Sequence, residues 1–195
     1  MKLIDCMGIY DNTLDPKICL TLMKIMNSGK YKIIQQTQTL QHSNDNMNNS
    51  IRIGTEMLLD NPDHEVVKSK LLKATFKVID RYIEQTSGMS DYILPNLNPY
   101  KFENFRIRKY KKNEGFFKLH SDIIDYKSAS RLFVIMFYLN SVKIGGETEF
   151  PLLDIKVKPK QGSCVIFPPN FLFPHQANIP ISHHKFTAQT YLHYM

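Results

Sequence analysis

Three residues have the side chains and the spacing of a metal site. His120 and Asp122 are two positions apart, so on an extended strand their side chains point to the same face and can bind one ion. A third ligand must come from a distant segment, and His175 lies where one is needed. Two imidazoles and one carboxylate fill three positions around a metal ion and leave the others open for reactants. The pattern predicts such a metal centre; the alternatives are a surface His-x-Asp pair and a packed histidine after Pro174.

Further motifs lie between and after these three residues. They are YLN at 138–140, GGETEF at 145–150, KPKQGSCVIFPP at 158–169, and Lys185, ten positions after His175. On these motifs, the segment from about Asn104 to Tyr194 resembles the 2-oxoglutarate- and Fe(II)-dependent dioxygenases, in particular their prolyl 4-hydroxylase branch. The resemblance covers roughly half of the chain.

The resemblance implies a role for each predicted ligand. In the prolyl 4-hydroxylase branch, a His-x-Asp pair and a distal histidine hold the catalytic Fe(II); here these are His120, Asp122 and His175. Related halogenases have no carboxylate at the position of Asp122, and chloride binds there instead. Because this chain has Asp122, the resemblance favours hydroxylation over halogenation.

The resemblance also implies a binding site for 2-oxoglutarate. A basic residue about ten positions after the distal histidine binds the far carboxylate of this co-substrate, and here it is Lys185. Thr148 of the GGET turn and Tyr110, which precedes the His-x-Asp pair, match residues that lie beside the co-substrate. The chain departs from the family pattern at two positions: His183 stands for a glycine before Lys185, and Tyr191 stands for a tryptophan.

The implied reaction consumes 2-oxoglutarate and O2. Decarboxylation of 2-oxoglutarate to succinate and CO2 is coupled to hydroxylation of an unactivated C–H bond, with ascorbate as the expected reductant. The branch resemblance implies a prolyl residue of a peptide or protein as the substrate. Free amino acids or other small molecules, lysyl side chains and nucleic-acid bases stay open as substrates, as does the oligomeric state. Arg131, at the start of RLFVIMFYLN, is a candidate contact at the substrate mouth.

Two other function classes fit parts of the sequence. One is a cupin-like protein that binds a metal or ligand without turnover, although such a protein has no need for Lys185 and Thr148. The other is a nucleic-acid dioxygenase, which the net charge of +7 favours (25 Lys and Arg against 18 Asp and Glu). The same charge is also typical of a Lys-rich soluble surface, so nucleic acid is the less favoured partner.

Length and composition indicate a single soluble domain. A chain of 195 residues with 43% hydrophobic residues is long enough to bury one core. No apolar run reaches the length of a membrane span, and the N-terminus has no secretory pattern. The three cysteines have unrelated spacings, which indicates a reducing compartment. We predict a cytoplasmic protein with one domain over 1–195, with supporting helices and outer strands in 1–103 and a catalytic core in 104–195.

Helices and extended segments are both predicted in the first half. Asp15 and Pro16 suit the N-cap and first turn of one helix, and apolar residues recur at helical spacing over 63–85. Extended segments are predicted over 4–11 and 31–40. Loops are predicted over 41–50 and 89–103, which show little periodicity.

Short strands separated by turns dominate the second half. We predict them over 104–111, 116–122, 131–140, 147–150, 155–158, 163–168, 172–177 and 185–194. This spacing is typical of a sandwich or a barrel, and the resemblance narrows the choice to a double-stranded β-helix, a jelly-roll or cupin-like core flanked by N-terminal α-helices. The expected fold class is mainly β with supporting helices (α+β).

One conflict arises in the first of these strands. If Tyr110 points into the barrel, Arg108 and Arg106 point inward with it, while Phe105 and Ile107 point outward. Charged residues inside and apolar residues outside reverse the usual pattern of a half-exposed strand. A β-bulge would be one remedy.

Overall fold

The computed structural model describes residues 2–39, 50–86 and 101–193. The α-helices are α1 (Pro16–Asn27) and α2 (Glu65–Gln85). The strands are β1 (Gly8–Tyr10), β2 (Ile34–Thr39), β3 (Ser50–Leu58), β4 (Lys101–Phe102), β5 (Arg106–Tyr110), β6 (Phe116–His120), β7 (Arg131–Tyr138), β8 (Thr148–Phe150), β9 (Ile155–Val157), β10 (Cys164–Phe167), β11 (His175–Ala177) and β12 (Lys185–His193).

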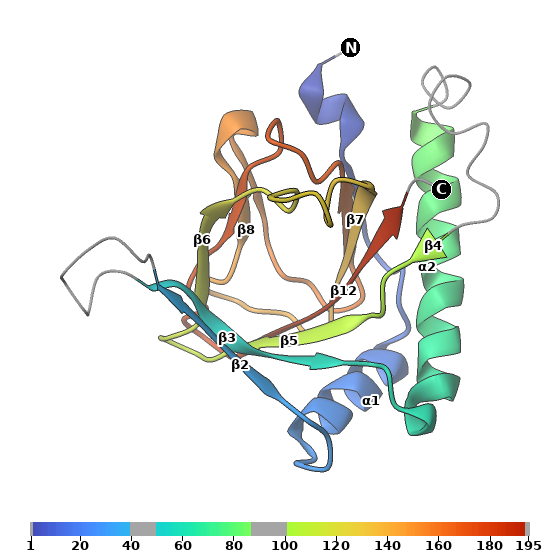
Figure 1. The fold of residues 1–195 in the computed structure, drawn as a ribbon, viewed down its shortest axis with the longest axis vertical. Coiled ribbons are helices and arrows are strands. Elements are labelled where there is room, and N and C mark those ends of the chain that lie inside the picture. The colour runs from blue at the N-terminus through green and yellow to red at the C-terminus, as the bar shows by residue number, and fades with distance from the viewer. Residues whose placement is uncertain (1, 40–49, 87–100, 194–195) are drawn as a thin grey trace.

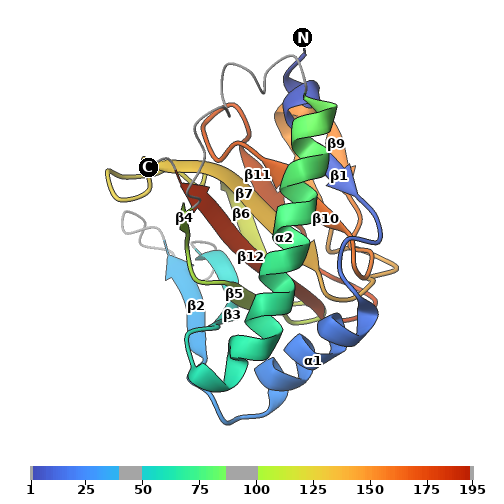
Figure 2. The ribbon, with the colours of Figure 1, turned by 90° about the vertical axis from the view of Figure 1, so that its right-hand side faces the viewer.

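The strands form one antiparallel sheet that curls into a barrel-like shape. Its twelve strands follow the order β1-β10-β7-β12-β5-β3-β6-β11-β8-β9, with β2 paired to β3 and β4 paired to β12. In Figure 1 the sheet curves round an interior, with β6 and β8 across from β7 and β12. Figure 2 shows that α2 runs along the outside of this sheet and that α1 lies near the lower end of α2. The predicted fold class, mainly β with supporting helices, is confirmed.

Most predicted elements are present with shorter ends. Each strand predicted between 104 and 194 exists, and two are shortened most: 104–111 becomes Arg106–Tyr110 and 172–177 becomes His175–Ala177. The extended segment predicted over 4–11 is wrong in its first part. There Leu3–Cys6 forms a 3-10 helix, in which the Asp5 amide donates to the Lys2 carbonyl at 3.0 Å.

Both helices begin at side-chain caps. The Asp15 carboxylate accepts a hydrogen bond of 2.7 Å from the Lys17 amide, which confirms the predicted start of α1. A 3-10 turn, Pro62–His64, precedes α2, and Asn61 caps it by accepting from the Asp63 amide at 2.9 Å. The helices bury apolar side chains towards the sheet: Cys19, Leu22, Met26, Leu71, Val78, Ile79 and Tyr82.

The sheet separates two apolar cores. Alternate residues of β7 illustrate the separation, because successive side chains of a strand point to opposite faces. Phe133, Ile135 and Phe137 join the core beneath the helices, whereas Val134 and Met136 join a second core inside the barrel.

The position of the helices removes the conflict in β5. Ile107 and Phe105 point outward as predicted, but they are 0% and 2% exposed because they belong to the core beneath the helices. Tyr110 and Arg108 are buried on the opposite face. The β5–β12 register runs from Lys185 opposite Tyr110 without a shift, so β5 needs no bulge.

The first half of the chain contributes strands to the same sheet as the second half. Residues Thr55–Leu58 of β3 pair with β5, and Arg52 and Ile53 of β3 pair with β6. Most of each loop predicted over 41–50 and 89–103 lies outside the described residues. At their ends the loop prediction is wrong, because Ser50 begins β3 and Lys101–Phe102 form β4. Among the described helices, none has both the length and the apolar character needed to cross a lipid bilayer.

Candidate active site

The pairing of β6 with β11 brings the predicted metal ligands together. His120, the last residue of β6, is the direct partner of His175, the first residue of β11. Asp122 follows two residues later, and one ligand atom from each of the three residues lies within 4.8 Å of the others. Nε2 of His120 is 3.8 Å from Oδ1 of Asp122, and Nε2 of His175 is 3.5 Å from Oδ2. The three side chains predicted as a metal centre therefore converge.

Hydrogen bonds to main-chain carbonyls orient both imidazoles. Nδ1 of His120 lies 2.8 Å from the Lys118 carbonyl oxygen, and Nδ1 of His175 lies 3.1 Å from that of Phe173. A carbonyl oxygen only accepts, so each Nδ1 carries the hydrogen and each Nε2 keeps its lone pair. With the rings held in this way, both Nε2 atoms face Asp122 and present their lone pairs, as metal-binding histidines require.

The two oxygens of Asp122 have different surroundings. Oδ1 accepts a hydrogen bond of 2.8 Å from the Tyr191 hydroxyl. Oδ2 is buried and has no hydrogen-bond partner among the described residues. A buried carboxylate oxygen without a partner is costly, and a cation between Oδ2 and the two Nε2 atoms would satisfy it. This donor set fits Fe(II), which takes two imidazoles and one carboxylate with open positions beside them.

The electrostatics of the site favour the metal-binding forms of its ligands. Burial lowers the pKa of His120 to about 3 and also lowers the pKa of His175, so both imidazoles are neutral at pH 7. Burial by itself raises the pKa of the Asp122 carboxyl. The Arg108 guanidinium and the hydrogen bond from the Tyr191 hydroxyl oppose this effect, and the pKa of the carboxyl lies below its ordinary value.

The residues predicted for the co-substrate also meet inside the barrel. Lys185 is 1% exposed, and its Nζ donates to Oγ1 of Thr148 at 3.2 Å. The same Nζ lies 5.6 Å from the ring centroid of Tyr110 and 5.5 Å from that of Tyr138. Within the described residues no carboxylate forms an ion pair with Lys185, and burial lowers the pKa of its ammonium to about 7. A buried cation in this setting fits an anionic ligand.

Two glycines of the GGET turn place Thr148. Gly145 and Gly146 have φ angles of 72° and 75°, which residues other than glycine rarely adopt. A Cβ on Gly145 would also collide with the Ile179 carbonyl oxygen. Thr148 then accepts a hydrogen bond of 2.8 Å from the Tyr138 hydroxyl. Sequence reasoning missed this role of Tyr138, although the YLN motif was its signal.

The sequence of the segment that carries these residues matches the model of one known family. Residues 105–193 match the sequence model described as 2OG-Fe(II) oxygenase superfamily. The predicted resemblance of this segment to the Fe(II)- and 2-oxoglutarate-dependent dioxygenases is confirmed. The predicted class, a 2-oxoglutarate-dependent Fe(II) dioxygenase, is confirmed. None of the curated proteins compared with this oxygenase matches it.

Solved structures with similar folds include several prolyl hydroxylases. A viral collagen prolyl hydroxylase from Paramecium bursaria chlorella virus 1, in complex with 2OG, is 20% identical, with a TM-score of 0.69 and coverage of 97% of both chains. A Pseudomonas putida prolyl-4-hydroxylase is 15% identical, with a TM-score of 0.67 and coverage of 97% of this chain and 92% of its own. A Trichoplax adhaerens prolyl hydroxylase, in complex with a hypoxia inducible factor peptide fragment, is 15% identical, with a TM-score of 0.67 and coverage of 97% and 84%. The shared fold confirms the predicted double-stranded β-helix of the oxygenase.

A buried charge cluster of the oxygenase lies next to the metal ligands. Nε of Arg108 donates to Oε2 of Glu56 at 2.7 Å, and Nη2 of Arg52 reaches the same oxygen at 3.1 Å. Arg108 also donates through Nη1 to Oε1 of Gln189. The sequence analysis predicted only that Arg108 points into the barrel with Tyr110, and it assigned this charge no partner. The alternation of charged residues along β5 was the signal of a polar barrel interior.

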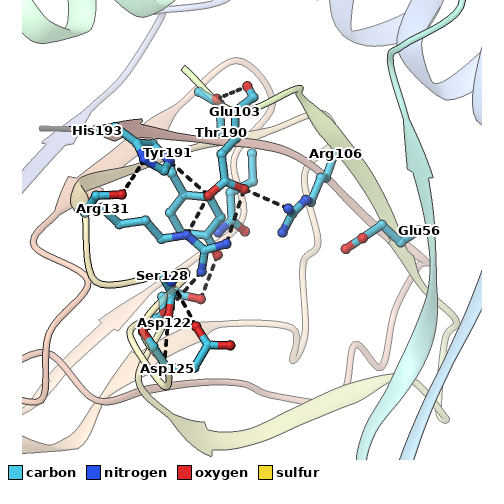
Figure 3. A network of polar contacts seen from close by, with 12 residues as sticks. Glu56, Glu103, Arg106, Asp122, Asp125, Ser128, Arg131, Thr190, Tyr191 and His193 are labelled. Carbon is cyan, nitrogen blue, oxygen red and sulfur yellow. Dashed lines mark hydrogen bonds and ion pairs between the residues drawn. The ribbon is translucent and has the colours of Figure 1, made fainter. Parts of the chain in front are cut away.

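Arg131, the predicted substrate contact, lies beside Asp122 (Figure 3). Its Nη1 donates to the Asp122 carbonyl oxygen at 2.7 Å, and its guanidinium carbon lies 3.7 Å from the ring centroid of Tyr191. Its Nε donates to Glu103 at 2.6 Å and its Nη2 donates to the same carboxylate at 3.2 Å. The structure thus brings Arg131 to the site of the oxygenase. Contact with a substrate stays a prediction.

Proposed function

We propose that this 2OG-Fe(II) oxygenase hydroxylates a prolyl residue of a peptide or protein. The observation that carries the proposed site is the convergence of His120, Asp122 and His175 within 4.8 Å, inside the same barrel as the buried ammonium of Lys185. Prolyl specificity is supported by the motifs that resemble the prolyl 4-hydroxylase branch and by the fold shared with three prolyl hydroxylases. A peptide or protein partner is supported by the peptide bound in one of them.

The proposal assigns Fe(II) binding to His120, Asp122 and His175. When bound there, the iron supplies the activation of O2 that couples decarboxylation of 2-oxoglutarate to hydroxylation of the substrate. The net reaction converts substrate, 2-oxoglutarate and O2 into hydroxylated substrate, succinate and CO2. Neutral Nε2 atoms and an ionised carboxylate present lone pairs to the ion without prior loss of a proton.

Lys185, Thr148 and Tyr110 are assigned to 2-oxoglutarate. The ammonium of Lys185 neutralises the far carboxylate of the co-substrate, in an interior where a charge-assisted hydrogen bond is strong. Thr148 lies within hydrogen-bonding distance of that ammonium, and its hydroxyl is oriented by Tyr138. Tyr110 covers the ammonium with its ring. These residues hold the co-substrate and exclude water from it.

The buried ammonium also argues against a metal-binding protein without turnover. Desolvating a charge without a counter-ion costs free energy. A metal centre alone gains nothing from that cost, whereas a site for a dicarboxylate co-substrate does.

The first experiment measures succinate formed from 2-oxoglutarate by the protein reconstituted with Fe(II) under anaerobic conditions and then exposed to O2. A proline-rich peptide is compared with the same peptide in which alanine replaces each proline. We expect more succinate with the proline peptide, together with a mass gain of one oxygen atom on that peptide. Succinate that neither peptide stimulates would contradict the prolyl substrate but keep the oxygenase; free amino acids and single-stranded nucleic acid would then be assayed.

Three further parts of the proposal concern the surroundings of the reaction. Ascorbate is proposed as the reductant, and its omission is expected to shorten the period of linear succinate release. A cytoplasmic location is proposed, supported by Cys19 and Cys164, which are buried free thiols. The whole of 1–195 is proposed as one domain, supported by the strands that both halves contribute to one sheet.

A further inference from the structure

We propose that Tyr191 and Arg131 are positioning residues that present a single oxygen of Asp122, Oδ2, to the metal ion. This inference rests on the proposed function, because it takes Asp122 as a metal ligand. It concerns how the ligand is held, and it assigns to Arg131 a role inside the site.

The Tyr191 hydroxyl distinguishes the two carboxylate oxygens. It donates to Oδ1 of Asp122 at 2.8 Å, whereas Oδ2 has no hydrogen-bond partner among the residues that the structure describes. Oδ2 is also the oxygen that lies 3.5 Å from Nε2 of His175. One oxygen is therefore engaged by the protein and the other is left for the ion, which favours a monodentate ligand. Hydrogen bonds of this kind orient metal-binding carboxylates.

The main chain of Asp122 is held on both sides. Its carbonyl oxygen accepts from Nη1 of Arg131 at 2.7 Å, and its amide donates to the Pro169 carbonyl oxygen at 3.1 Å. Together with the bond from Tyr191, these contacts fix the residue at three points. A ligand fixed in this way loses little conformational freedom when the ion binds.

Arg131 and Tyr191 also hold each other. The guanidinium carbon of Arg131 lies 3.7 Å from the centroid of the Tyr191 ring, a cation–π distance. Glu103 fixes the other side of the guanidinium through Nε at 2.6 Å and Nη2 at 3.2 Å. All three nitrogens of Arg131 thus have partners in the protein.

Glu103 belongs to a wider network that fixes Arg131 (Figure 3). Its carboxylate also accepts from Nη2 of Arg106 at 2.7 Å and lies 3.0 Å from Nε2 of His193. Since every nitrogen of Arg131 points to Glu103 or to Asp122, the guanidinium is directed at the metal ligand. A substrate contact by Arg131 would require one of these bonds to break.

The test removes one hydroxyl and measures metal binding directly. Wild type and Tyr191→Phe are titrated with Co(II), used as a redox-stable substitute for Fe(II), under argon, and the visible absorption of the bound ion is followed. We expect Tyr191→Phe to bind Co(II) roughly 10- to 100-fold more weakly and to show a changed absorption spectrum. Tyr82→Phe is the matched control, because it removes a buried hydroxyl that donates to the Cys6 carbonyl at 2.9 Å, away from the metal ligands.

Arg131→Lys is the second variant. Lysine keeps the charge but cannot bond Glu103 and the Asp122 carbonyl with the fork of a guanidinium. We expect weaker Co(II) binding than in wild type, with the KM for peptide changed less than the metal affinity. If Arg131 acts by contacting substrate instead, the KM for peptide rises and Co(II) affinity stays at the wild-type value.

The outcomes separate this inference from the proposed function. Wild-type affinity and spectrum in both Tyr191→Phe and Arg131→Lys would overturn the inference and leave the metal centre intact. An equal loss of affinity in Tyr82→Phe would overturn it as well, because the effect would then be general loosening. No Co(II) binding by wild type would instead overturn the proposed metal centre. Circular dichroism of the metal-free proteins identifies a variant that does not fold, and the other variant then decides.

Discussion

The ammonium of Lys185 lies 3.2 Å from the hydroxyl oxygen of Thr148, inside a barrel where Lys185 is only 1% exposed. Without an anion beside it, burial lowers its pKa from 10.5 to about 7. The charge proposed to bind 2-oxoglutarate is therefore only partly present at neutral pH until the co-substrate arrives.

This relationship predicts that the affinity for 2-oxoglutarate falls as the pH rises above about 7. The protonated lysine binds the anion, and the bound anion raises the pKa of the lysine again, so binding takes up a proton. Affinity is then highest below the free pKa and falls at most about tenfold per pH unit above it. Calorimetry of the Co(II)-loaded protein in buffers of different ionisation enthalpy measures this uptake. Affinity that is independent of pH, without proton uptake, would contradict the prediction.

Lys185→Met is expected to stabilise the protein while abolishing co-substrate binding. The unfolded lysine titrates near 10.5 and the folded one near 7, so the wild type loses stability as the pH falls from about 10 to 7. Methionine has no charge to desolvate, so the free energy of unfolding at pH 7 is expected to rise by on the order of 3 kcal/mol. Urea unfolding at pH 7 and at about pH 10 tests this, since the advantage of the variant should shrink at the higher pH. A variant less stable than wild type at pH 7 would refute it.

His120→Ala is expected to abolish both tight metal binding and succinate formation. The variant keeps only Asp122 and His175, and loss of one of three ligands leaves the ion poorly held. His183→Ala is the control, because it removes an exposed imidazole from the loop before β12. Metal titration and the succinate assay are run on both variants. Normal turnover by His120→Ala would refute the metal centre.

Glu56→Gln is expected to destabilise the fold strongly. Its carboxylate is the shared partner of Arg108 and Arg52, so the variant removes the negative charge that pairs with both buried guanidiniums. Removing one partner of a buried ion pair costs roughly 3–5 kcal/mol. Glu84→Gln, on the exposed side of α2, makes the same chemical change and is expected to stay within about 0.5 kcal/mol of wild type. Similar unfolding midpoints for the two variants in urea would show that the cluster adds little stability.

The sequence predicted most of the elements that carry the site. Helix caps, period-two strands and the same-face spacing of His120 and Asp122 are local properties, because they follow from neighbouring residues and backbone sterics. The local pattern also placed Tyr110, Arg108 and Arg106 on one face of β5. It did not show that the opposite face, with Ile107, lies beneath the helices, because that depends on where distant helices pack.

Only the tertiary structure decided how the site residues meet. The β6–β11 register sets His120 opposite His175, and the Tyr191 hydroxyl from β12 engages one of the two oxygens of Asp122. The partners of Arg131 likewise come from segments far apart in sequence. Residue types and spacings determined which candidate metal ligands and which candidate co-substrate contacts this protein has. The hydrogen bonds that hold Asp122 depended on long-range pairing, since Tyr191 and Arg131 lie on strands that reach it only once the sheet has closed.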